Sequence, residues 1–295
     1  MLKKCLKSVK KMNKNLQTFI GCDADFENAD IVLFGAPFDG TTSFRPGTRF
    51  GPSAIRNESF GIETYSPYQG KDLTEISACD IGDLELPFGN TERILGIIKE
   101  TADEILKAGK IPVMLGGEHL ITLATVSAAL KKHPDLHIIH FDAHTDLRDE
   151  YLGEKLSHST VMRRIWDKVG DGRIHQFGIR SGEKYEFEFA NEHTVIHKFS
   201  LEGFEETAEK LKGKPVYFSL DLDILDPSFF CGTGTPEAGG VTFTELLNAI
   251  LCLDKLNVVA CDINELSPVY DQSGTSTAVA CKITREILLT LKGDK

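Results

Sequence analysis

The chain has 295 residues, of which 41% are hydrophobic and 26% are charged, and its formal net charge is −11. This composition is typical of a globular protein and provides enough chain for one large α/β domain or two small ones. The acidic balance argues against nucleic acid or an anionic membrane as the main partner and suits a cationic ligand.

The chain begins with a basic segment, residues 1–15, which holds six lysines in MLKKCLKSVKKMNKN. This segment lacks the apolar centre of a secretory signal, and we expect a flexible tail. No run of 18 apolar residues occurs in the sequence, so no membrane span is predicted. Because no linker or repeat divides the remainder, residues 16–295 are expected to form one domain.

Short apolar, β-branched runs then alternate with longer amphipathic patterns. Strands are predicted at residues 30–35, 77–81, 111–115, 136–141, 174–179, 194–197, 215–220 and 257–261. Helices are predicted at residues 90–109, with Asn90 as N-cap, and at about 120–132, 159–169, 201–212, 243–254 and 276–292. Pro52 is expected to open a further helix. This alternation predicts an α/β fold, with a mainly parallel sheet and helices on both of its faces.

Polar, ligand-type side chains follow four of the predicted strands. They are His119 in GGEH, Asp142, His144 and Asp146 in DAHTD, Asp221 and Asp223 in DLDILDP, and Glu265 in DINELSP. Taken singly, such residues are common in loops, and a histidine after two glycines is more often a loop or capping residue than a ligand. Ligands bind at the carboxyl ends of parallel strands, however, and four aspartates gathered there would repel one another without a counter-charge. Together the motifs therefore predict a metal site.

The donor set indicates which metal is expected. Two histidines and four aspartates exceed the needs of one four-coordinate zinc ion, and hard oxygen donors with little imidazole favour manganese over calcium or copper. Two divalent ions would balance four carboxylates and leave room for a bridging hydroxide, the nucleophile of two-metal hydrolases. The seven cysteines are scattered without a CxxC pair, so they predict neither a disulfide framework nor a thiolate zinc site, and they favour a reducing, cytoplasmic setting.

The order and spacing of GGEH, DAHTD and SLDLDILDP resemble the metal motifs of the ureohydrolase family of arginases and agmatinases. The similarity begins at about Thr18 and includes GAPFDGTTSFRPGTRFGPSAIR, GTGTPEAGG and DINELSP. It implies a three-layer α/β/α fold with an eight-stranded, mainly parallel sheet, two Mn²⁺ ions per subunit, and trimers or hexamers. The implied metal ligands are His119, Asp142, His144, Asp146, Asp221 and Asp223, with Asp142, Asp146 and Asp221 bridging.

The resemblance also implies roles for two further residues. His158, in KLSHSTVMRR, matches the position of a proton-shuttling histidine, although its place in the sequence alone suggests a neighbour of a helix N-cap. Glu265 matches the carboxylate that holds the substrate guanidinium, and its alternative role is a structural salt bridge. By contrast, His137 and His140 lie within a predicted strand, where packing is expected rather than ligation.

The segment after DAHTD distinguishes between possible substrates. Arginases have an Asn- and Ser-bearing segment that ends in SGNxHG, whereas this chain has DLRDEYLGEKLSHST. DLRDEY, SFRPG and GTPEAGG resemble agmatinases instead, which makes agmatine the expected substrate, arginine a poor candidate and 4-guanidinobutyrate an alternative. Agmatine is a dication, so the acidic side chains of Asp149, Glu150 and Glu237 are candidates to attract its far ammonium group.

The predicted reaction converts agmatine to urea and putrescine, a step of polyamine biosynthesis. A hydroxide bridging the metals attacks the guanidinium carbon held by Glu265, Asp146 passes a proton to the departing amine, and His158 relays protons to bulk water. Two other hydrolases remain open, a guanidinobutyrase-like enzyme and a one-zinc, deacetylase-like enzyme of related fold, and metal stoichiometry separates the latter. A non-catalytic metal-binding protein is a third alternative, but both His158 and Glu265 are present.

Overall fold

The computed structural model describes residues 17–291, so the tail predicted for residues 1–15 lies outside the described residues. Eight strands form one parallel sheet in the order β4-β1-β5-β10-β9-β6-β7-β8. Their bounds are β1 Ile31–Ala36, β4 Ala78–Asp83, β5 Ile111–Gly116, β6 His137–Phe141, β7 Ile174–Ile179, β8 Val195–Lys198, β9 Pro215–Asp221 and β10 Asn257–Asn264. The eight-stranded, mainly parallel prediction is confirmed.

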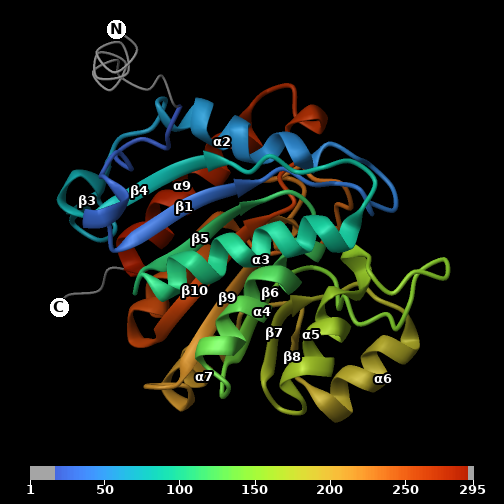
Figure 1. Ribbon diagram of the computed structural model, residues 1–295. Coiled ribbons are helices and arrows are strands. Elements are labelled where there is room, and N and C mark those ends of the chain that lie inside the picture. Colours follow the sequence, from blue (N-terminus) through green and yellow to red (C-terminus); the bar gives the residue numbers. More distant parts are fainter. Residues whose placement is uncertain (1–16, 292–295) are drawn as a thin grey trace, which may run out of the picture.

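Helices cover both faces of the sheet, which gives the three-layer arrangement seen in Figure 1. One face carries α3 Thr91–Lys107, α4 Thr122–Lys132, α5 Val161–Val169 and α6 Lys184–His193, and the other carries α2 Gly51–Ser59, α7 Phe204–Lys210, α8 Phe243–Leu251 and α9 Thr275–Leu291. None of the helices in residues 17–291 has both the length and the apolar character needed to cross a membrane.

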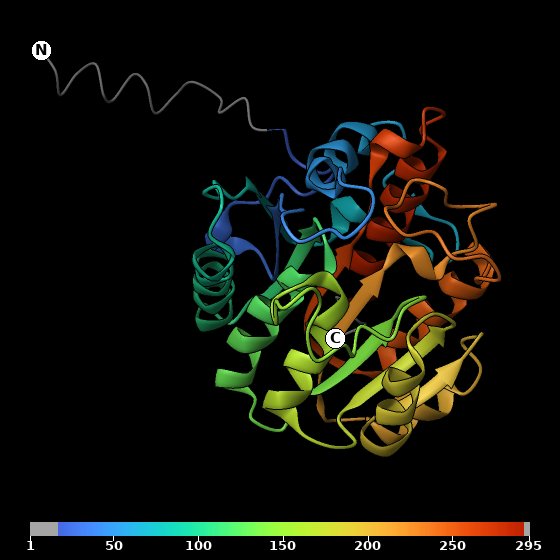
Figure 2. The same ribbon diagram turned by 90° about the vertical axis from the view of Figure 1, so that its right-hand side faces the viewer.

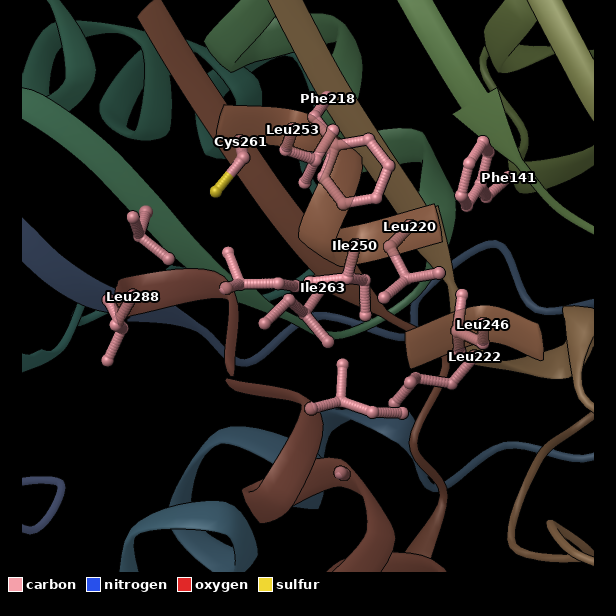
Figure 3. Close-up of a cluster of buried hydrophobic side chains, with 14 of the residues drawn as sticks. Phe141, Phe218, Leu220, Leu222, Leu246, Ile250, Leu253, Cys261, Ile263 and Leu288 are labelled. Atoms are coloured by element: carbon pink, nitrogen blue, oxygen red, sulfur yellow. The ribbon is translucent and has the colours of Figure 1, made fainter. Parts of the chain in front are cut away.

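The central strands are continuously apolar because both of their faces are covered. All residues of β1 and β9 are buried, as expected for strands between two helical layers. In the core shown in Figure 3, Phe218 and Leu220 of β9 and Ile263 of β10 pack with Leu246 and Ile250 of α8. Full burial of each such side chain contributes about 1.5–3 kcal/mol.

The ends of two helices follow the rules used to predict them. Asn90 caps α3, since its Oδ1 accepts a hydrogen bond from the backbone N–H of Arg93 at 2.9 Å. Pro52 lies in the first turn of α2, where its missing N–H has no cost. Helix α7 begins later than predicted, at Phe204, because Gly203 before it adopts a left-handed φ of 82°.

Two features were not predicted. Helix α6 has the sequence KYEFEFANEH, whose aromatic residues alternate with a period of two and therefore suggest a strand. A capping box nevertheless starts this helix, in which Glu183 and Glu186 accept each other's backbone N–H groups. A small antiparallel hairpin of β2 (Tyr65–Ser66) and β3 (Lys71–Asp72) lies outside the main sheet.

Candidate active site

The predicted ligands lie at the carboxyl ends of β5, β6 and β9, the edge of the sheet that faces the viewer in Figure 2. Strands β4, β1 and β5 form one half of the sheet and β6, β7 and β8 form the other. The later strands β10 and β9 lie between the two halves, so the order of strands along the chain reverses at the middle of the sheet. Such a reversal of strand order opens a crevice above the middle strands, which is the usual ligand position in parallel sheets.

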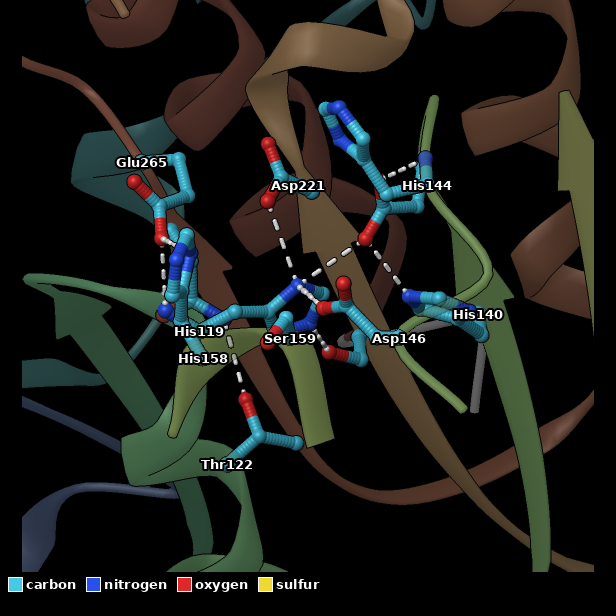
Figure 4. A network of polar contacts seen from close by, with 12 residues as sticks. His119, Thr122, His140, His144, Asp146, His158, Ser159, Asp221 and Glu265 are labelled. Carbon is cyan, nitrogen blue, oxygen red and sulfur yellow. Dashed lines mark hydrogen bonds and ion pairs between the residues drawn. The ribbon is translucent and has the colours of Figure 1, made fainter. Parts of the chain in front are cut away.

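His119 lies at the centre of the carboxylate cluster. Its Nδ1 atom is 3.0 Å from Oδ2 of Asp142, 3.1 Å from Oδ2 of Asp221 and 3.4 Å from Oδ2 of Asp146. Figure 4 shows His119, Asp146 and Asp221 gathered at this point. The loop that carries His119 needs the preceding glycine, because a Cβ atom at Gly117 would lie 1.9 Å from the carbonyl oxygen of Phe38.

His144 and Asp223 form a second group beside the first. Nδ1 of His144 is 3.0 Å from Oδ2 of Asp223 and 3.4 Å from Oδ1 of Asp142. Asp142 thus presents one carboxylate oxygen to His119 and the other to His144. The structure therefore brings all six predicted ligands together. Asp142 is shared between two groups that could each hold a metal ion, one with His119, His140 and Asp146 and the other with His144 and Asp223.

The electrostatics of the cluster favour bound cations. Burial, followed by repulsion from neighbouring carboxylates, raises the pKa of both Asp146 and Asp221 well above the usual range. Burial alone would lower the pKa of His119, but the neighbouring carboxylates of Asp142 and Asp221 raise it well above its usual value. The cluster therefore needs positive charge, which either protons or metal ions supply.

The chemistry of His119 Nδ1 tests whether a metal ion fits. This atom is buried and has no hydrogen-bond partner of acceptable geometry among the described residues, although three carboxylate oxygens lie around it. A nitrogen lone pair that faces several carboxylates without hydrogen-bond geometry is typical of donors arranged around a cation. The residues present therefore fit a metal site.

His140 is buried beside this group but serves Asp142 rather than facing a metal position. Its Nε2 is 2.8 Å from Oδ2 of Asp142, and the side-chain amide of Gln176 donates to its Nδ1 at 3.0 Å. Gln176 also donates to the carbonyl of Thr145 at 2.9 Å, which fixes the amide orientation. Nε2 of His140 therefore carries the proton and donates it to Asp142. The expectation that His140 is packed rather than ligating agrees with this geometry.

Two residues of the site have strained backbones. Among the described residues outside glycine, Asp146 (φ 53°) and Glu265 (φ 67°) are two of four with positive φ. A left-handed conformation costs a non-glycine residue about 1–2 kcal/mol, so the surrounding contacts must stabilise it. For Glu265 one such contact is the hydrogen bond that its backbone N–H donates to the carbonyl of Gly117 at 2.9 Å.

Glu265 and His158 lie next to the metal cluster. Oε1 of Glu265 accepts the backbone N–H of His119 at 2.8 Å and is 3.9 Å from Nδ1 of His158. Burial, followed by repulsion from Glu118, raises the pKa of Glu265 to about 8. Burial, followed by the charge of His144, lowers the pKa of His158 to about 4, so its imidazole is neutral at pH 7.

The loop after β1 contacts His158 from the solvent side. The backbone N–H of Ser43 lies 3.2 Å from Nε2 of His158, and Oγ of the exposed Ser43 lies 2.9 Å from the same atom. Glu118 anchors this loop, because its carboxylate accepts the N–H of Thr41 at 2.9 Å and the hydroxyl of Thr42 at 3.0 Å. Burial raises the pKa of Glu118 to about 7.

A cavity of about 330 Å³ opens from the metal cluster toward solvent. Besides His144, Asp146, His158, Asp221 and Glu265, its walls include Ser43, Arg148, Tyr151, Ser181, Glu183, Glu186 and Thr235. Sequence reasoning missed Glu183, although it follows the carboxyl end of β7 and the rule applied to four other strands would have found it.

The structure does not bring the three predicted ammonium-binding acids into this cavity. The carboxylate of Glu237 is outside the lining and accepts a hydrogen bond from Oγ of Ser181 at 3.0 Å. Asp149 is exposed and pairs with Arg164 at 2.8 Å, and Glu150 is also exposed outside the lining. The acidic groups on the cavity wall are instead Glu183 and Glu186.

Known proteins are similar to this chain over most of its length. A sequence model described as "Arginase family" matches residues 29–290. A protein from Bacillus anthracis named agmatinase is 49% identical over 277 residues, which cover 92% of this chain and 96% of that protein. A guanidinobutyrase from Pseudomonas aeruginosa is 36% identical over 92% of this chain and 89% of its own length. The crystal structure of agmatine ureohydrolase of Thermoplasma volcanium superimposes with a TM-score of 0.85 at 33% identity, covering 98% of this chain and 97% of that one.

Proposed function

The chain belongs to the arginase family, and on that premise we propose that it hydrolyses agmatine to urea and putrescine. It is a hydrolase that acts on the C–N bonds of guanidino compounds. The observation that carries the proposal is the convergence of a buried His–Asp cluster and the buried carboxylate of Glu265 on one cavity. The putrescine released would supply polyamine biosynthesis.

Enzymes of this family are metal-dependent, and the proposed cofactor is a pair of Mn²⁺ ions. The ions would be held by His119, Asp142, His144, Asp146, Asp221 and Asp223. Support comes from the two donor groups that share Asp142 and from the predominance of carboxylate oxygens. When bound, such ions supply an activated water at neutral pH and stabilise developing negative charge.

Glu265 is proposed to hold and orient the guanidinium group. Its Oε1 is held by the N–H of His119 at 2.8 Å, so the position of the carboxylate is set before substrate arrives. Burial raises the pKa of this carboxyl to about 8, and a guanidinium cation beside it would favour the ionised form again. Pairing with the substrate therefore offsets the cost of burying Glu265.

Asp146 and His158 are proposed to move protons. The attacking water gives its proton to the carboxylate of Asp146, which lies on the cavity wall. Asp146 passes that proton to the amine nitrogen as its bond to the guanidinium carbon breaks. The released amine then takes up the remaining proton of the added hydroxyl group through solvent, which leaves neutral urea and the putrescine dication. His158 exchanges protons with solvent through its Nε2 atom, which contacts the exposed Ser43.

Glu183 is proposed to attract the far ammonium group of agmatine, in place of Asp149, Glu150 and Glu237. The guanidinium of Arg148 lies 3.3 Å from Glu183 and 3.5 Å from Glu186, so two carboxylates outweigh one cation on this wall. A net negative wall favours a cationic substrate tail over a carboxylate tail.

A second candidate function rests on Arg148. If this guanidinium turned toward the cavity, it would suit the carboxylate of 4-guanidinobutyrate, and a guanidinobutyrase is among the relatives. Urea release measured with Mn²⁺ on agmatine, 4-guanidinobutyrate and arginine in parallel tests the choice. Agmatine is expected to have the highest kcat/KM, and faster turnover of either of the others would reject the proposal.

The protein is further proposed to act as a cytoplasmic homo-oligomer, a trimer or a hexamer. The six cysteines in the described part of the chain carry free thiols, as expected in a reducing compartment. Exposed aromatic side chains, including Phe44, Phe50 and Phe60, are candidates for subunit contacts. Light scattering of the purified protein gives the oligomeric state directly.

A further inference from the structure

Four buried polar side chains face one another between the two middle strands of the sheet. Tyr217 and Ser219 are on β9, Asp262 and Asn264 are on β10, and all four are fully buried. Ser219 and Asp262 are direct partners in the parallel register. Burying polar groups at the centre of a sheet is costly unless each is hydrogen-bonded, so this cluster requires an explanation.

The hydrogen bonds of the cluster converge on the carboxylate of Asp262. Oγ of Ser219 donates to Oδ1 of Asp262 at 2.7 Å, Nδ2 of Asn264 donates to the same oxygen at 2.8 Å, and the hydroxyl of Tyr217 donates to Oδ2. Burial raises the pKa of Asp262, whereas these donors favour the ionised form. Three donors directed at one carboxyl group identify it as an acceptor.

Ser219 connects this carboxylate to His119. Its Oγ lies 2.8 Å from Nε2 of His119. The hydroxyl has a single proton, which it gives to Asp262, so toward His119 its oxygen accepts and Nε2 must carry a hydrogen. That tautomer leaves the lone pair on Nδ1, the atom that faces Asp142 and Asp221.

We propose that Asp262 and Ser219 are positioning residues that hold His119 in its metal-binding tautomer. The charge of Asp262, relayed through the Ser219 hydroxyl, also makes Nδ1 a stronger donor. This inference rests on the metal site of the proposed function but not on the identity of the substrate. Outer partners of this kind typically change metal affinity by about 10- to 100-fold when removed.

Tyr217 provides a matched control within the same cluster. Ser219→Ala and Tyr217→Phe each remove one buried hydroxyl donor to Asp262, but only Ser219 also contacts His119. Mn²⁺ affinity of the full-length protein is measured without substrate, by following the EPR signal of free Mn²⁺ during titration. Ser219→Ala is expected to raise the Kd by at least about tenfold, and Tyr217→Phe by less than about twofold.

Asp262→Asn is the second variant, and it decides the question if Ser219→Ala does not fold. It removes the charge at nearly constant volume and is expected to weaken Mn²⁺ binding as Ser219→Ala does, while thermal melting without metal reports any general loss of stability. Wild-type affinity in the serine or aspartate variant, or an equal loss in Tyr217→Phe, would overturn the proposal. Agmatine turnover of the wild type is recorded separately, so a wrong substrate leaves the metal result intact.

Discussion

Nδ1 of His119 lies 3.0 Å from Oδ2 of Asp142, although the strands that precede them, β5 and β6, are separated in the sheet by β10 and β9. Neighbouring strands are about 4.8 Å apart, so three steps correspond to roughly 14 Å. The two loops must therefore lean toward each other over the ends of β9 and β10. Asp221 and Glu265 come from the carboxyl ends of the middle strands β9 and β10. The site is therefore built from residues of both halves of the sheet and of the strands between them.

His119→Ala is expected to remove one ligand from this junction and to lower Mn²⁺ stoichiometry and activity together. Without this ligand the site is expected to bind Mn²⁺ more weakly, so the repulsion between the remaining carboxylates is less well offset. Metal content after dialysis, determined by elemental analysis, and urea release measure the two effects. His133→Ala, at the end of α4, serves as the control. Full activity with both metals absent would contradict the scheme.

Glu265→Gln is expected to lower kcat/KM for agmatine ~30- to 5000-fold, because a buried charge partner of the guanidinium is lost. This loss corresponds to a free-energy cost of about 2–5 kcal/mol. The glutamine oxygen can still accept the N–H of His119, so the loop geometry should persist. Mn²⁺ content is therefore expected to remain at the wild-type value. A parallel loss of metal would instead identify Glu265 as a structural or ligating residue.

The strands and the meeting of the metal motifs were predictable from sequence for physical reasons. Strands buried on both faces produce continuous apolar runs, such as IVLFGA in β1, and the carboxyl ends of parallel strands share one edge. His119 and Asp223 could therefore be grouped without knowing which strands are neighbours. The insertion of β9 and β10 between β5 and β6 depends on tertiary packing and leaves no local pattern.

The parts of the site that sequence reasoning did not find depend on contacts between distant segments. Glu237 and Glu183 are both acidic loop residues, and only the fold places Glu183 on the cavity wall and Glu237 outside it. The role of Asp262 is similarly hidden, because its hydrogen-bond partners Tyr217 and Ser219 belong to another strand. Motif reading identifies residues that face a ligand more readily than residues that act through them.

His158→Asn is expected to lower kcat by about 10²- to 10⁴-fold, the usual contribution of a proton-transferring side chain. With a pKa of about 4, the wild-type imidazole stays neutral above pH 5, so its protonation should not limit activity between pH 6 and 9. Added imidazole is expected to restore part of the lost rate. His175→Asn is the control, because burial also lowers the pKa of His175 to about 4 but this residue lies outside the cavity.

Glu183→Gln is expected to raise KM for agmatine with little change in kcat. The side chain of Glu183 is 56% exposed, so its attraction for an ammonium group is worth about 0.2–1 kcal/mol, or ~1.4- to 5-fold in KM. The effect should shrink at high ionic strength. Glu188→Gln, on the same helix and outside the cavity lining, is the matched control. An equal change in KM in both variants would show that Glu183 has no specific role in substrate recognition.

Asp226→Asn is expected to destabilise the protein at neutral pH and less so in acid. Asp226 accepts the backbone N–H groups of Ser228 at 3.0 Å, Gly239 at 2.7 Å and Gly240 at 3.2 Å, and so closes the loop that carries Thr235 to the cavity. Hydrogen bonds from the hydroxyl and backbone of Ser228, then from Gly239, lower the pKa of Asp226 to about 2.

A carboxyl whose folded pKa lies below its unfolded value of about 3.9 stabilises the fold above that value, and the effect is lost as pH falls toward 2. Because Asp226 is partly exposed, solvent screening reduces its contribution to about 1 kcal/mol at pH 7. The difference in unfolding free energy between wild type and Asp226→Asn should therefore be constant from pH 7 to 5 and fall to about half at pH 3. Urea unfolding at these pH values measures it, with Asp135→Asn, an exposed carboxylate before β6, as the control. A difference that grows as pH falls would show that the loop is not held by the ionised carboxylate.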